Sequence, residues 1–171
     1  FMGFGQIARG QIGKGLFYFF IEIAFLLYMI FFGGIYVGHL FSGDLGTRLS
    51  GEKWNESLQI FEKVKGDNSF LILLYGVVSL VVVTLFLFLW RMNVLGSYEN
   101  DLRIRKGESL TTFKQDVVML LNDRFYIPLL LLPFVGLLVF TIMPLIFMVL
   151  IAFTNYDYAH TPPGKLFDWV G

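Results

Sequence analysis

Cysteine is absent from the sequence, which excludes disulfide bonds, thiolate metal sites and a cysteine nucleophile. Histidine is scarce, since His39 and His160 are the only two and lie far apart in the chain. Charged residues make up only 15% of the chain and have no net charge, whereas 56% of the residues are hydrophobic and 18% are aromatic. This composition excludes an ordinary soluble domain and is typical of an integral membrane protein.

Three long apolar runs predict three membrane-spanning helices. They are Leu16–Val37, Phe70–Trp90 and Phe125–Phe153. About 20 apolar residues cross a hydrocarbon core of about 30 Å, because a helix rises about 1.5 Å per residue. The sequence therefore predicts an all-α integral membrane protein with three transmembrane helices, at 16–37, 70–90 and 125–153.

Glu22 is the only charged residue inside these runs. Its insertion cost of about 3 kcal/mol is outweighed by many Leu, Ile, Phe and Val residues, each favourable by about 0.3 to 0.6 kcal/mol. The residue lies about 9 Å into the span, so it can reach the interface or a partner helix. A carboxylate in a proton or ion path is one interpretation. A structural role is favoured, because no second acidic residue or histidine shares the spans.

Prolines interrupt the third run. Pro128 and Pro133 lie near its start and Pro144 lies inside it. Each removes a backbone donor and pushes its ring against the carbonyl four residues earlier. Lipid offers no water to the freed carbonyl, so we expect this helix to pack against other helices and to bend near Pro133 or Pro144.

The connection of residues 38–69 is polar and is predicted to contain one amphipathic helix over Gly51–Lys65. Ser50 is a candidate cap at its start and Gly66 at its end. We expect this helix to lie on the membrane surface or on a neighbouring chain. The apolar stripe that predicts it recurs at helical spacing: Trp54, Leu58, Phe61 and Val64.

The charged segment of residues 91–124 is predicted to end in a second short amphipathic helix that leads into the third span. Thr112–Gln115 matches a capping box, and apolar residues follow at helical spacing. A basic cluster at residues 103–106 could bind anionic lipid or nucleic acid, but three cations beside a membrane span more often set topology. No nucleic-acid partner is expected.

Lysine and arginine set the expected orientation. They are more numerous in residues 1–15 and 91–124 than in residues 38–69 and after 153. The positive-inside rule then predicts a cytoplasmic lead-in at 1–15, an extracytoplasmic loop at 38–69, a cytoplasmic loop at 91–124 and an extracytoplasmic segment starting at 154. The protein is expected in a cell membrane, multi-pass, with its N-terminus in the cytoplasm.

Two possible chemical sites are weak on inspection. Gly10–Gly15 lacks the Ser or Thr after Lys14 and the Gly six residues before it that a phosphate-binding loop requires, so a turn is favoured. Asp157, His160 and Asp168 could form a cluster, but solvation in a loop explains them more simply. No catalytic residue, cofactor or metal ligand is assigned.

Four motifs in the last third of the chain form one pattern: Pro144–Phe147, Ala152–Asp157, Pro162–Gly164 and Phe167–Gly171. This pattern resembles the permeases of bacterial carbohydrate ABC importers. Gly3–Gln6, Gly10–Gln11 and Lys14–Gly15 also resemble the start of such permeases in Gram-positive bacteria. The resemblance is strongest to the larger maltose or maltodextrin permease subunit.

The resemblance implies a transport subunit rather than an enzyme, together with partners on other chains. These are a second permease subunit, two cytoplasmic ATPase subunits that bind and hydrolyse ATP, an extracellular sugar-binding protein and the lipid bilayer. The Glu-Ala-Ala loop that docks the ATPase in this family is absent, and the chain starts at Phe1, so we interpret it as the N-terminal part of a longer permease. No substrate-binding residue can be carried over. Structural or coupling candidates are Glu22, Pro133, Pro144, Asn155 and Tyr156.

Two other functions remain open from the sequence. A small three-span membrane anchor or assembly subunit fits the same spans. A membrane-embedded transferase fits less well, because such chemistry needs converging acid, base or metal groups and the spans offer only Glu22.

Overall fold

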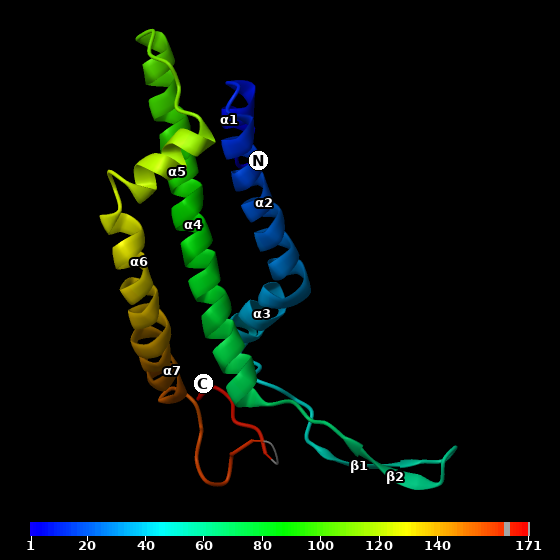
Figure 1. Ribbon diagram of the computed structural model, residues 1–171. Coiled ribbons are helices and arrows are strands. Elements are labelled where there is room, and N and C mark those ends of the chain that lie inside the picture. The colour runs from blue at the N-terminus through cyan, green and yellow to red at the C-terminus, as the bar shows by residue number, and fades with distance from the viewer. Residues whose placement is uncertain (163–164, 171) are drawn as a thin grey trace. The chain divides into compact units, whose positions relative to one another are not determined.

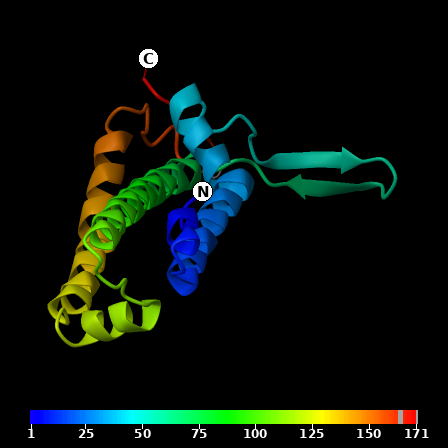
Figure 2. The ribbon, with the colours of Figure 1, turned by 90° about the horizontal axis from the view of Figure 1, so that it is seen from above.

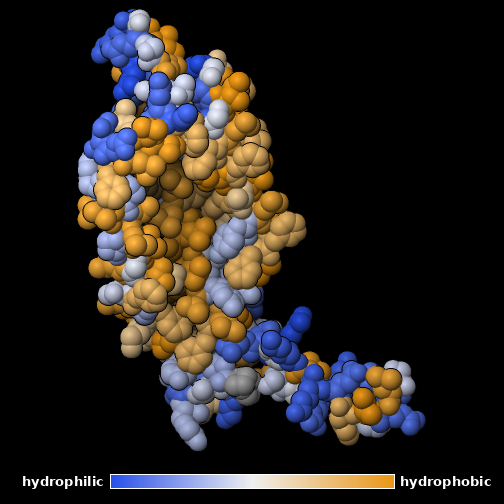
Figure 3. Space-filling view, in the orientation of Figure 1, coloured by the Kyte–Doolittle hydropathy of each residue, from blue (hydrophilic) through white to orange (hydrophobic). Residues whose placement is uncertain are grey.

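The computed structural model describes residues 1–162 and 165–170 and is built mainly of helices (Figure 1). Within this described part, three helices are long and apolar enough to cross a membrane: Ile12–Ser42, Ser69–Arg105 and Tyr126–Ile151. Hydrophobic side chains predominate on the visible face of the helical spans (Figure 3). The prediction of a mainly helical protein with three spans is confirmed.

The chain forms two compact units. The first unit consists of Phe1–Met29 and Val81–Val139, and the second consists of Ile30–Leu80 and Phe140–Gly171. Each of the three long helices therefore contributes residues to both units.

The lead-in of residues 1–15 is largely helical and belongs to the first unit. A short helix, α1 (Phe4–Ala8), precedes α2 (Ile12–Tyr28) and packs against it. Gly3 adopts a left-handed conformation with φ of 81°, and a Cβ atom at Gly15 would lie 2.6 Å from the Gly3 carbonyl oxygen. Glycine at both positions therefore permits α1 to approach the backbone of α2.

The second long helix, α4 (Ser69–Arg105), continues beyond Trp90, where the span was predicted to end. Its 37 residues correspond to about 55 Å, which exceeds the hydrocarbon core by about 25 Å. Residues 91–105 contain no proline and many good helix formers, so the helix persists outside the apolar run. Two helices follow in the first unit: α5 (Phe113–Leu121) and α6 (Tyr126–Leu137).

The predicted start of α5 is confirmed. The Thr112 side chain accepts from the Gln115 backbone N–H, and the Gln115 side chain accepts from the Thr112 backbone N–H. This reciprocal capping satisfies two donors that the first turn leaves without intrahelical partners.

In the second unit, a small core joins the loop at Leu45, the start of α4 and the tail at Phe167. The π-helical turn η1 (Met29–Gly33) leads into α3 (Gly34–Ser42), and a second π-helical turn, η2 (Leu138–Ile142), leads into α7 (Met143–Ile151). Phe70 packs edge-on against Phe167, with ring centroids 5.0 Å apart. The buried members of this core are Leu45, Ile72, Leu73 and Phe167.

The amphipathic helix predicted over Gly51–Lys65 is wrong. These residues form an antiparallel hairpin of β1 (Gly51–Asn55) and β2 (Ile60–Val64), whose strands run side by side in Figure 2. Trp54 lies directly opposite Phe61, and their rings meet edge-on at 4.9 Å. The spacing of the apolar residues fitted a helix, but aromatic cross-strand pairing and a turn at Asn55 favour the hairpin. This small sheet accompanies an otherwise helical fold.

The turn of the hairpin depends on Asn55. Its side-chain oxygen accepts hydrogen bonds from the backbone N–H groups of Ser57 and Leu58. Gln59 has a positive φ of 51° and completes the reversal. Opposite charges also face each other across the strands, Glu52 against Lys63 and Lys53 against Glu62.

Candidate functional site

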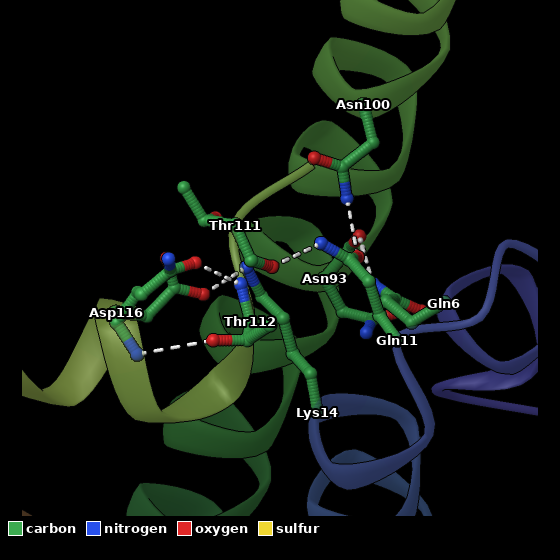
Figure 4. Close-up of polar contacts among 9 residues, drawn as sticks. Gln6, Gln11, Lys14, Asn93, Asn100, Thr111, Thr112 and Asp116 are labelled. Atoms are coloured by element: carbon green, nitrogen blue, oxygen red, sulfur yellow. Dashed lines mark hydrogen bonds and ion pairs between the residues drawn. The ribbon is translucent and has the colours of Figure 1, made fainter. Parts of the chain in front are cut away.

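Four buried amide side chains form a cluster in the first unit, where the lead-in meets the end of α4. We call Gln6, Gln11, Asn93 and Asn100 the amide cluster; each is at most 7% exposed. Asn100 Nδ2 donates to Gln11 Oε1 at 2.9 Å, and Gln11 Nε2 donates to the Thr111 carbonyl at 2.7 Å (Figure 4). Gln6 Nε2 donates a longer hydrogen bond, of 3.4 Å, to the backbone carbonyl oxygen of Asn93. Gln11 therefore connects the lead-in with both α4 and the segment before α5.

These hydrogen bonds favour one particular pairing of the lead-in with α4 and with the segment before α5. A buried amide that loses its partner costs about 1–3 kcal/mol, whereas a formed hydrogen bond contributes only about 1 kcal/mol net. The amide cluster therefore contributes more to the specificity of pairing than to overall stability. It holds the lead-in on the part of α4 that extends beyond the apolar run.

Two ion pairs flank the amide cluster. Arg9 contacts Asp101 of α4 at 2.8 Å, and Lys14 of α2 contacts Asp116 of α5 at 2.6 Å. Burial raises the pKa of Asp116, but hydrogen bonds from Lys14 and Thr111 outweigh it and leave that pKa below its ordinary value. Both pairs are partly exposed, so their contribution to stability is modest.

Glu22 lies in the first unit and contacts the lead-in. Its Oε2 atom accepts a hydrogen bond from the Met2 backbone N–H at 2.8 Å, and the Met2 side chain is buried. The carboxylate thus satisfies a backbone donor of a segment that α2 covers. This contact agrees with a structural role for Glu22.

The prolines of the third long helix lie in different local settings. Pro133 is inside α6, whereas Pro144 is in the first turn of α7, directly after the π-helical turn η2. Pro144 cannot donate to the carbonyl of Phe140, and the wider π turn accommodates that missing bond before α7 begins. A π turn therefore precedes Pro144, whereas Pro133 lies within the α-helix and leaves the carbonyl of Leu129 without its intrahelical donor.

Asn155 and Tyr156 hold the tail of the second unit against the end of α7. Asn155 and Asp168 form two reciprocal bonds, Asp168 N–H to Asn155 Oδ1 at 2.7 Å and Asn155 N–H to the Asp168 carbonyl at 2.9 Å. The Tyr156 ring packs edge-on against Phe70 at 4.9 Å and against Phe167 at 5.5 Å. The motif residues Pro163, Gly164 and Gly171 lie outside the described residues.

The cluster considered for Asp157, His160 and Asp168 is not formed. His160 Nδ1 lies 2.7 Å from Asp157 Oδ1, and this contact is the largest factor lowering the pKa of Asp157. Asp168 is engaged instead by Asn155 and by the Leu45 N–H. No group of three metal-ligating side chains occurs in residues 1–162 and 165–170.

Asn155 and Tyr156 thus both contact the tail of the second unit, whereas Glu22 and Pro133 lie in the first unit. Sequence reasoning missed the amide cluster. One signal was present: Asn93 and Asn100 are seven residues apart, which puts both on one face of a helix. The prediction of a loop over residues 91–124 hides this signal, because the seven-residue spacing has a meaning only on a helix.

A groove of about 500 Å³ lies beside the amide cluster, between the start of α2 and the start of α5. Its wall includes Arg9 and Lys114 but no carboxylate, and it is formed by residues 9–13 and 110–114. A paired acid and base are lacking there, so the groove offers no arrangement for group transfer.

Comparisons with known proteins identify relatives of the chain. It is 31% identical over 170 residues to the maltodextrin transport system permease protein MdxF of Bacillus subtilis, covering 99% of this chain and 35% of MdxF. The maltodextrin transport system permease protein MalC of Streptococcus pneumoniae is 28% identical over the same shares. The galactooligosaccharides transport system permease protein GanP of Bacillus subtilis is 26% identical, covering 99% of this chain and 36% of GanP.

These relatives confirm the resemblance to carbohydrate permeases. The chain spans about a third of the length of the relatives it matches, which is consistent with an N-terminal part of such a protein. No protein-family model matches the chain, and no solved structure matches it.

Proposed function

We propose that the chain forms the N-terminal membrane part of a permease subunit in an ATP-driven importer of oligosaccharides, of the maltodextrin type. The similarity to three oligosaccharide permeases over 99% of the chain carries this proposal, supported by three helices long enough to span a membrane. Maltodextrins and galactooligosaccharides are the substrate classes that the names of the relatives suggest.

In this role the chain contributes structure rather than chemistry. The amide cluster and the Arg9–Asp101 and Lys14–Asp116 pairs fasten the lead-in to α4 and α5. Asn155 and Tyr156 hold the tail against the rest of the second unit. We propose that these contacts hold the first spans in place as a scaffold while the rest of the permease moves during transport.

The proposal includes partners and a location. A second permease subunit, two ATPase subunits that hydrolyse ATP in the cytoplasm and an extracellular sugar-binding protein would complete the importer. The chain would lie in the cytoplasmic membrane of a bacterium with its N-terminus inside. Its own residues would neither bind nor hydrolyse ATP.

Uptake by the full-length parent permease tests the proposal. The parent gene is deleted, and uptake of radiolabelled maltotriose and of a radiolabelled galactooligosaccharide is compared with uptake of an unrelated amino acid. Loss of oligosaccharide uptake alone, restored by the intact gene, is expected. Unchanged uptake of maltodextrins and of galactooligosaccharides in the deletion strain would contradict the proposal.

A further inference from the structure

An apolar stripe on α5 is only partly covered by the described part of the chain. Its members share one face of the helix, since their spacing follows the helical period. Each is more than a third exposed, and Leu121 is 55% exposed. The stripe consists of Phe113, Val117, Leu120 and Leu121.

Two independent contacts place α5 at the level where α2 begins its apolar run. Asp116 pairs with Lys14 at 2.6 Å, and the Phe113 ring lies 5.7 Å from the Phe17 ring. The apolar run of α2 begins at Leu16. Asp116 of α5 therefore contacts Lys14, the last charged residue before the apolar run of α2. Phe113, at the start of α5, contacts the first turn of that run.

The connection to α6 gives the same level. Four residues, 122–125, separate Leu121 from the start of α6 at Tyr126, and an extended chain covers at most about 3.5 Å per residue. The end of α5 therefore lies within about 18 Å of the start of a membrane span. Figure 1 shows α5 lying across the direction of the later part of α4 rather than along it.

Cations stand at both ends of α5. Lys114 and Arg124 are exposed, and neither forms an ion pair among the described residues. Long basic side chains can keep their charge at the lipid headgroups while their stems cover apolar surface. A helix with an apolar face and flanking cations lies in the plane of the interface and favours anionic lipid.

We infer that α5 is an interfacial helix that lies on the lipid surface, with its apolar stripe among the acyl chains and with Lys114 and Arg124 on the phosphates of anionic phospholipids. This inference goes beyond the proposed transport function and does not depend on the transported sugar.

Lipid quenching in the intact permease tests the position of the stripe. A bimane label is placed on a single cysteine at Val117 or Leu121 in the full-length protein, in nanodiscs of brominated phosphatidylcholine and brominated phosphatidylglycerol. Both labels should be quenched by brominated lipid, and a label at the exposed Glu108 of the preceding loop should not. Unquenched labels at both stripe positions would overturn the inference, whether water or another protein segment covers them.

Charge removal tests the lipid preference separately. With the Leu121 label, brominated phosphatidylglycerol should quench more strongly than brominated phosphatidylcholine at equal mole fraction. Lys114→Gln with Arg124→Gln should remove most of this preference, since each cation near a charged surface corresponds to about a fivefold change in local affinity. Lys53→Gln with Lys63→Gln in the hairpin is the matched control and should leave it unchanged. If the protein with both cations, the Lys114/Arg124 double variant and the hairpin double variant all showed the same preference for phosphatidylglycerol, the role assigned to the two cations would be overturned.

Discussion

Asn100 of α4 donates a hydrogen bond to Gln11, which lies just before α2, although 89 residues separate them in the chain. Both side chains are buried. Gln11 in turn donates to the Thr111 carbonyl, so one side chain joins three segments of the first unit. Several expectations follow from this geometry and from the contacts around it.

Replacing Gln11 by Leu should destabilise the protein, because the Asn100 amide and the Thr111 carbonyl both lose a partner in a buried site. The expected loss is about 1–3 kcal/mol, and Asn100→Leu in the same protein should recover part of it. Thermal unfolding of the detergent-solubilised full-length permease measures both effects. Additive losses in the double variant would show that the two side chains do not interact.

Replacing Glu22 by Gln should leave transport nearly unchanged, because the amide oxygen can still accept from the Met2 N–H. Glu22→Leu removes that acceptor and should lower the unfolding temperature. Uptake of labelled maltotriose at matched expression checks the first variant. A complete loss of uptake in Glu22→Gln, with normal stability, would favour the ion-path interpretation instead.

The Asp116 carboxyl should make stability depend on acid pH. Its pKa is lowered in the folded protein from the ordinary value of 3.8, so the unfolded state binds more protons in that range. The contribution is complete above the ordinary value and disappears as the pH falls through the lower folded-state pKa. Acid unfolding curves of wild type and Asp116→Asn should therefore converge as the pH decreases, and parallel curves would contradict this.

The orientation can be checked with cysteines in an otherwise cysteine-free background. Glu56→Cys lies in the turn of the hairpin and should react with an impermeant maleimide added to intact cells. Lys106→Cys, after the end of α4, should react only after the membrane is opened. The reverse pattern would invert the topology.

Pro144→Ala should restore a backbone donor for the Phe140 carbonyl and thereby favour a regular α-helix in place of the π turn η2. We expect reduced sugar uptake with near-normal expression, because we propose that the interruption at Pro144 sets the direction of α7 and thereby the position of Thr154–Asp157. Pro128→Ala, at the beginning of α6, is the control and should have a smaller effect. Full transport activity of Pro144→Ala would show that the interruption of the helix at Pro144 is not needed for sugar uptake.

Much of the helical framework could be predicted from the sequence, because long runs without charge leave few alternatives to membrane helices. The capping box at Thr112 was also readable, since both partners lie within one turn. The hairpin was not, because Trp54 and Phe61 are seven residues apart and fit a helical stripe as well as a cross-strand pair.

The amide contacts were hidden for a different reason. Gln11 finds Asn100 and Thr111 only when distant segments pack together, and the seven-residue spacing of Asn93 and Asn100 does not show which residues they contact. Glu22 could be identified as unusual, but its partner is a backbone N–H of Met2 that no side-chain pattern reveals.

The close approach of Gly3 and Gly15 also has a consequence for the order of biosynthesis. The contacts between residues 2–8 and α2, including the Met2–Glu22 bond, involve residues no more than about 20 positions apart, so they can form as soon as α2 enters the membrane. The bonds to Asn93, Asn100 and Asp101 must wait until α4 has been synthesised. Until then the amides of Gln6 and Gln11 remain hydrated, and they provide a preformed surface on which the emerging end of α4 can select its register.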